Sequence, residues 1–218
     1  MFQEVWNSNL HAAFSIIEAW RDEFLYISFD LEFAGFLWRT PRHIHSEFVI
    51  YNHLRYNVNR LKPIQIGINL GNESGLFSHT WQFNLSGFDA DVDSSGPGAV
   101  DFLRNSGIDL ERNLSEGIPV NEFAKYFLKT FVDGGRNREH KWITFHGIND
   151  FAYMIKIITA PPLPYDLVEF CSLVAKYFGR VYDIKCMAGP FKELMGGMIG
   201  LVKMASILNI DTKQAMIA

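Results

Sequence analysis

Apolar side chains near the N-terminus recur at intervals of three and four residues, which places them on one helical face: Leu10, Ala13, Phe14 and Ile17. Residues Tyr26–Phe33 are rich in the aromatic and β-branched side chains that favour a strand. A second helix is predicted from Glu47 to about Arg60. Alternation over Ile64–Ile68 predicts a further strand, and Trp81–Phe83 predicts another. The three strands predict an antiparallel meander.

The pattern changes after a polar run from Asp89 to Gly98, which predicts a surface loop. Helices and strands then alternate, with helices near Val100 and after Pro119, a buried strand at Trp142–Phe145, a helix from Asp150, a long amphipathic helix over Leu167–Phe178, a short strand at Val181–Tyr182 and a last helix over Leu201–Leu208. A meander followed by such units predicts an α/β fold, a three-layer sandwich with a mixed β-sheet. We expect a single domain over residues 1–218.

Composition and charge narrow the class of protein. A chain of 218 residues with 48% hydrophobic residues is large enough for one sizeable core. A net charge of −4 excludes the broadly basic surface of a non-specific nucleic-acid binder, but allows an enzyme whose bound cations supply positive charge. Cys171 and Cys186 lack disulfide or zinc spacing, which is typical of a reducing compartment. The sequence shows neither a signal peptide nor an apolar run long enough for a membrane span, so we expect no membrane association.

Two acids stand two positions apart in the first predicted strand. Side chains at this spacing share one face, so Asp30 and Glu32 are expected to lie side by side. Two close carboxylates repel each other unless a proton or a cation lies between them. The pair is therefore a candidate site for divalent metal ions, and pairs of such ions cleave phosphodiesters in many enzymes. The alternative is an ordinary solvated strand edge.

A third candidate acid follows the strand that ends at Phe145. Asp150 lies where this strand passes into a helix, at the strand's carboxyl end, where ligands bind in α/β sheets. The alternative is a helix N-cap, a role that Asp often has.

The chain also contains a longer pattern around these acids. Residues 30–35 read Asp-Leu-Glu-Phe-Ala-Gly and are similar to the D-x-E-F-x-G signature of the Caf/Pop-type poly(A) deadenylases, members of the DEDD nuclease superfamily. Further segments match this family in order: Tyr56–Gly67, Trp81–Asn84, Ser106–Asp109, Thr144–His146, Asp150–Phe151, Tyr153, Tyr182–Lys185 and Gly196–Gly197.

The resemblance implies a ribonuclease-H-like fold of the DnaQ exonuclease type. It implies a 3′-5′ exoribonuclease that removes adenylates from the poly(A) tail of mRNA with two divalent cations, Mg²⁺ or Mn²⁺. Asp30, Glu32 and Asp150 match three catalytic metal ligands of the family, whereas Asp183 matches a position outside that set and is expected to be structural. The implied partners are the mRNA poly(A) tail, the Ccr–Not scaffold and its companion deadenylase. The implied localisation is cytoplasm and nucleus.

The chain departs from the family beyond its last predicted helix. The family has an H-Q-A-G-S-D segment there that carries a His and the fourth acid, followed by a helix, and residues 211–218 do not reproduce it. Loss of a positioned general base costs about 10²–10⁴ in rate. We therefore expect reduced or absent activity. One alternative is a catalytically silent adaptor of the Ccr–Not complex, and another is an unrelated α/β binding module.

Overall fold

The fold is built on one mixed β-sheet. The computed structural model describes residues 2–41, 43–75, 78–133 and 140–210. The strands of the described chain lie in the order β1 (Phe2–Val5), β4 (Ser78–Asn84), β3 (Pro63–Gly71), β2 (Tyr26–Phe33), β5 (Lys141–Thr144) and β6 (Arg180–Asp183). β2, β3 and β4 pair antiparallel, as the predicted meander requires. The pairs β1–β4, β2–β5 and β5–β6 are parallel, so the predicted mixed sheet is confirmed.

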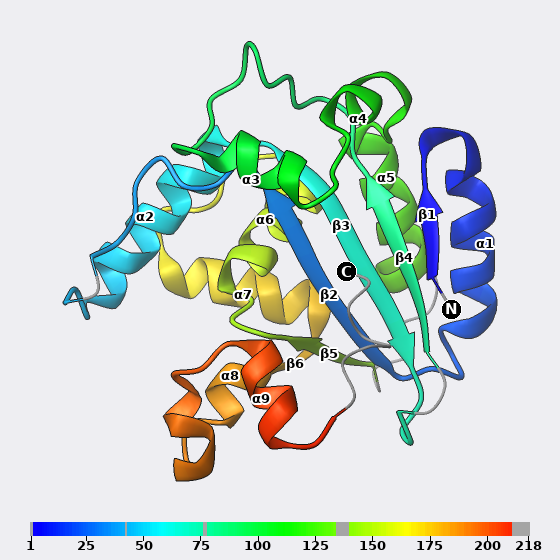
Figure 1. Ribbon diagram of the computed structural model, residues 1–218. Helices are drawn as coiled ribbons and strands as arrows, with labels where there is room; N and C mark the ends of the chain where they lie inside the picture. The colour runs from blue at the N-terminus through cyan, green and yellow to red at the C-terminus, as the bar shows by residue number, and fades with distance from the viewer. Residues whose placement is uncertain (1, 42, 76–77, 134–139, 211–218) are drawn as a thin grey trace.

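Helices connect the strands: in the view of Figure 1, α5 and α6 lie behind the sheet, α1 lies beside β1, α2 lies at the left, and α8 and α9 lie below β6. The α-helices are α1 (Leu10–Trp20), α2 (Glu47–Arg60), α3 (Ala99–Asn105), α4 (Leu110–Glu116), α5 (Val120–Phe127), α6 (Ile148–Thr159), α7 (Leu167–Phe178), α8 (Ile184–Met187) and α9 (Leu201–Ile207). Short 3₁₀ segments occupy Asn7–Asn9 and Lys192–Gly197, and a π-helical turn, Leu128–Asp133, continues α5. No helix among the described residues is long and apolar enough to cross a membrane.

The two faces of β2–β4 differ in chemistry. On β3, Ile64, Ile66 and Ile68 are at most 1% exposed and face the helices. Gln65 and Asn69, which alternate with them, are half-buried and lie on the opposite face. This face is polar and continues across the sheet, where Asn69 donates a 2.8 Å hydrogen bond to Thr80 and Gln65 a 2.6 Å bond to Asn84. Side chains on β2 therefore face either an apolar core or this polar face.

Aromatic packing holds the centre of β2 against the helices. The ring of Phe29 stacks on Phe178 of α7 at 5.7 Å and meets Phe151 of α6 edge-on at 4.9 Å, measured between ring centroids. Trp142 of β5 meets the same ring edge-on at 5.7 Å. Contacts of this kind stabilise a pair by about 0.5–1.5 kcal/mol beyond area burial. They fix the strand position next to Asp30.

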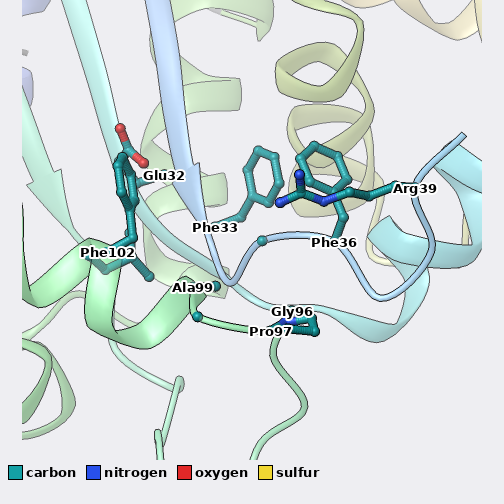
Figure 2. A pocket seen from close by; sticks show the side chains of 11 residues that line it. Glu32, Phe33, Phe36, Arg39, Gly96, Pro97, Ala99 and Phe102 are labelled. Carbon is teal, nitrogen blue, oxygen red and sulfur yellow. The ribbon is translucent and has the colours of Figure 1, made fainter. Parts of the chain in front are cut away.

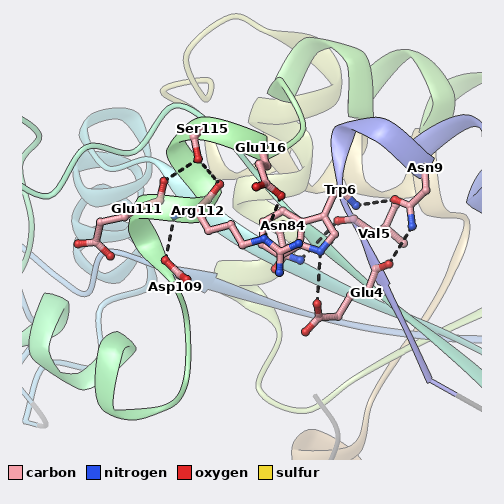
Figure 3. Close-up of polar contacts among 10 residues, drawn as sticks. All are labelled: Glu4, Val5, Trp6, Asn9, Asn84, Asp109, Glu111, Arg112, Ser115 and Glu116. Atoms are coloured by element: carbon pink, nitrogen blue, oxygen red, sulfur yellow. Dashed lines mark hydrogen bonds and ion pairs between the residues drawn. The ribbon is translucent and has the colours of Figure 1, made fainter.

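The first strand, β1, was not predicted, because four residues with one fully buried side chain carry little periodic signal. Its position is held by one local contact and by contacts from distant parts of the chain (Figure 3). The amide of Asn84 donates to the Val5 carbonyl at 3.5 Å, and the Asn9 side chain accepts from the Trp6 N–H at 2.7 Å. The guanidinium of Arg112 lies 3.9 Å from the Trp6 ring centroid. Helix α4, which carries Arg112, was also missed.

Candidate active site

Asp30 and Glu32 lie on the polar face of β2, side by side, as their spacing predicted. Asp30 is opposite Gly67 of β3, and Glu32 is opposite Gln65. Leu31, between them, faces the core and is 4% exposed. The two carboxylates therefore belong to a strand whose register is fixed by an apolar face, since a one-residue slip would bury them in the core.

Asp150 lies next to β2 although it belongs to helix α6, far away in the sequence. Helix α6 begins at Ile148 with Gly147 as its N-cap, so the alternative that Asp150 caps this helix is wrong. Its side chain is buried, and Oδ1 accepts a hydrogen bond of 3.2 Å from the N–H of Leu31. A long-range bond thus holds the third acid beside the strand segment that carries the first two.

The three carboxyl groups share an unusual electrostatic environment. Burial, followed by the charge of Asp30, raises the pKa of Glu32 to about 7. Burial and then the charge of Asp30 raise the pKa of Asp150 to about 7, against the opposing effect of the Leu31 hydrogen bond. The pKa of Asp30 is raised by burial as well. A site that penalises negative charge in this way favours protons or cations.

The donor set fits a divalent cation in its chemistry. Mg²⁺ and Mn²⁺ prefer carboxylate oxygens, and no cationic side chain in the described part of the chain lowers the pKa of these three carboxyl groups. In the part of the chain that the structure describes, however, no three His, Cys, Asp or Glu side chains converge closely enough to form a metal-binding group. The carboxylates are thus close enough to interact electrostatically, but they do not enclose a single point.

Asp183 has the structural role that was expected of it. Its Oδ1 accepts from the N–H groups of His146 and Lys185 at 3.0 and 2.9 Å, and its Oδ2 accepts from the N–H of Gly147 at 2.9 Å. His146 adopts a left-handed φ of 62°, a conformation that costs energy for a residue with a side chain. The carboxylate of Asp183 therefore stabilises the strained turn that leads into α6 and Asp150.

A pocket of about 350 Å³ opens beside Glu32 (Figure 2). Its wall contains aromatic rings, backbone and one cation: Phe33, Phe36, Arg39, Gly96, Pro97, Ala99 and Phe102. Gly96 is required there, because a Cβ atom would lie 2.5 Å from the backbone nitrogen of Phe36. The sequence predicted only a surface loop at Asp89–Gly98. A Gly-Pro-Gly run signals a special backbone, but not the segment that it contacts.

The fold matches those of solved structures. The structure of Pop2p from S. pombe, in its Mg²⁺- and Mn²⁺-bound form, superimposes with a TM-score of 0.83 at 33% identity, covering 96% of this chain and 82% of that one. A CAF1 chain crystallised with the MIF4G domain of yeast NOT1 matches with a TM-score of 0.79 at 26% identity, covering 96% and 79%. The fold is therefore that of a ribonuclease domain of the Pop2 type, and the expected ribonuclease-H-like class is confirmed.

Sequence comparison gives the family. The model described as CAF1 family ribonuclease matches residues 5–124 and 120–212. The probable CCR4-associated factor 1 homolog 7 of Arabidopsis thaliana is 33% identical over 218 residues, covering 96% of this chain and 78% of the relative. The poly(A) ribonuclease pop2 of Schizosaccharomyces pombe is 34% identical over 213 residues, covering 95% and 62%. The chain belongs to the CAF1 family of ribonucleases.

Proposed function

We propose that this chain is a 3′-5′ exoribonuclease that removes adenylates from the poly(A) tail of mRNA, more slowly than a family member that has the H-Q-A-G-S-D segment, because residues 211–218 do not reproduce that segment. The observation that carries the proposal is that Asp30 and Glu32 share one face of β2 while Asp150 of α6 accepts from the N–H of Leu31 between them, and that all three carboxyl groups have raised pKa values. The 34% identity to a poly(A) ribonuclease supports poly(A) RNA as the substrate. We propose Asp30, Glu32 and Asp150 as the residues that hold divalent cations, Mg²⁺ or Mn²⁺.

The protein's own groups define the chemistry that the site supports. Divalent cations, when bound, would make a water molecule more acidic and stabilise charge on the leaving oxygen. Asp30 and Glu32 supply carboxylate oxygens from a rigid strand, and the Leu31 N–H orients one oxygen of Asp150. The pocket beside Glu32 is of a size typical of small ligand sites and has aromatic walls, so it offers space for a nucleoside next to the acids.

The test is trimming of a 5′-labelled RNA with a 3′ oligo(A) tail in the presence of Mn²⁺, beside the same RNA with a blocked 3′ end. A ladder of shortened tails on the free end alone supports a 3′-5′ exonuclease. Equal cleavage of both RNAs, or shortening of an oligo(U) tail as fast as oligo(A), contradicts the proposal. Asp22→Ala is the matched control for Asp30→Ala, because Asp22 is an exposed acid on the turn after α1.

A second candidate function is that of a non-catalytic subunit of the Ccr–Not complex. It is favoured by the incomplete convergence of metal-binding side chains among the described residues. The related CAF1 chain was crystallised with a NOT1 MIF4G domain, which supports the NOT1 scaffold as the partner. Stable co-purification with that domain, together with no trimming by folded protein at any Mn²⁺ concentration, would favour this function over the first.

A further inference from the structure

An exposed tryptophan is held rigidly near the pocket. Trp38 is 52% exposed, yet its backbone is anchored on both sides by the buried Asn57 of α2. The Trp38 N–H donates to Asn57 Oδ1 at 2.9 Å, and its carbonyl accepts from Asn57 Nδ2 at 2.7 Å. The N–H of Leu37 donates to the same Oδ1 at 2.9 Å. A large apolar ring is thus presented to solvent on a fixed backbone.

Two rings contact this tryptophan, and two guanidinium groups lie over rings close to it in the chain or in space. The indole stacks on His53 at 5.0 Å and meets Tyr56 edge-on at 5.7 Å. Arg60 places its guanidinium 3.8 Å from the Tyr56 ring centroid, and Arg39 lies 5.8 Å from the ring of Phe36. We call Phe36, Trp38, Arg39, Tyr56 and Arg60 the aromatic-arginine strip.

The strip is continuous with the candidate active site. Phe36 and Arg39 line the pocket that Glu32 also lines (Figure 2), so the strip and the acidic site share one pocket. None of the ion pairs between described residues includes Arg39 or Arg60. Although the chain has a net charge of −4, no carboxylate among the described residues pairs with these two guanidinium groups, so they are available to bind an anionic ligand.

We propose that the aromatic-arginine strip binds single-stranded RNA outside the catalytic pocket, with bases stacked on Trp38 and phosphates paired with Arg39 and Arg60. Alternating rings and cations on a groove edge are the features that bind single strands with little sequence preference. A rigid ring loses little conformational entropy on stacking. The inference rests on the proposed function, since it supplies the path of the RNA whose 3′ end reaches the acids.

The strip is tested by binding of fluorescein-labelled oligo(A), longer than the ~4–16 nucleotides of a single-strand site, in EDTA. Trp38→Ala should weaken binding about fivefold or more, the fold-change expected for losing one stacked base. Arg60→Ala should also weaken binding, and should lower the slope of log affinity against log salt by about 0.7. Trp38→Phe, which keeps a ring, should restore most of the affinity.

Two matched variants remove similar groups elsewhere. Phe48 is 71% exposed at the far end of α2, so Phe48→Ala removes an exposed ring outside the strip. Arg112 lies over the Trp6 ring at 3.9 Å (Figure 3), so Arg112→Ala removes a guanidinium–aromatic pair at the β1 edge. Both should bind RNA within about twofold of the wild type. Equal weakening in the controls, or unchanged binding in Trp38→Ala and Arg60→Ala, would overturn the proposal.

Failure of the inference and failure of the proposed function give different results. Binding in EDTA requires no cleavage, so strip-dependent binding without trimming in Mn²⁺ would refute only the nuclease. Trimming by the wild type with Trp38-independent binding would refute only the strip. If the strip binds a protein instead, oligo(A) binding will not depend on Trp38 or Arg60, which overturns the RNA assignment.

Discussion

Replacing Asp150 by Asn should stabilise the metal-free protein at alkaline pH. The amide keeps an oxygen that accepts the Leu31 N–H, but it removes a negative charge from a side chain that is only 6% exposed. The pKa of Asp150 rises from an ordinary 3.8 to about 7 in the folded protein. At about 1.36 kcal/mol for each pKa unit, ionisation therefore costs up to about 4 kcal/mol of folding free energy.

The sign and the pH window follow from these two values. Below pH 3.8 the carboxyl group is protonated in both states, so its ionisation costs nothing. As the pH rises from 3.8 to about 7, the unfolded chain loses the proton first, and stability falls until the folded group ionises as well. The advantage of Asp150→Asn over the wild type should thus be small near pH 4 and largest near pH 8.

Urea unfolding in EDTA at several pH values measures this advantage directly. Asp22→Asn is the control, because Asp22 is exposed and should change stability by no more than about 0.5 kcal/mol at any pH. An advantage of Asp150→Asn that does not grow with pH would refute the electrostatic reasoning. A variant less stable than the wild type at pH 8 would refute it too.

Three further predictions concern the same site and its surroundings. Mn²⁺ should raise the melting temperature more at pH 8 than at pH 5.5, because protons compete for Asp150, whose pKa is about 7; a pH-independent shift in a thermal scan would contradict this. Gly96→Ala should destabilise by about 1–3 kcal/mol in urea, since its Cβ would meet the Phe36 backbone at 2.5 Å, whereas Gly200→Ala, with open space, should not. Tyr153→Phe should leave the urea midpoint unchanged or raise it, because the buried hydroxyl has no hydrogen-bond partner among the described residues; a loss above about 1 kcal/mol would be inconsistent.

Local patterns predicted the elements that carry the first two acids and the helix that follows. The strand Tyr26–Phe33 and the helix Glu47–Arg60 were found with the predicted bounds, since their apolar periodicity agrees with the final packing. The common face of Asp30 and Glu32 followed from the two-residue period of a strand alone. These features depend on neighbours in sequence.

Features that depend on distant contacts were not predicted. β1 pairs with β4, about 78 positions later in the chain, so its four residues gave no local signal. Asp150 was predicted as a candidate ligand from its place after a strand, but its bond to Leu31, 119 positions away, was not predicted, and its helix begins two residues earlier than expected. The pocket depends on Gly96 meeting Phe36 across a loop that was read only as polar. Periodic patterns in the sequence predict the elements, whereas these contacts form only in the assembled sheet.

The central claim is most directly tested by trimming of a 5′-labelled RNA with a 3′ oligo(A) tail, in Mg²⁺ or Mn²⁺, by the wild type and by Asp30→Ala side by side. We predict a ladder of shortened tails that requires the metal and disappears in Asp30→Ala, while both proteins remain folded by circular dichroism. Trimming that persists in Asp30→Ala, or no trimming by folded wild-type protein, would contradict it.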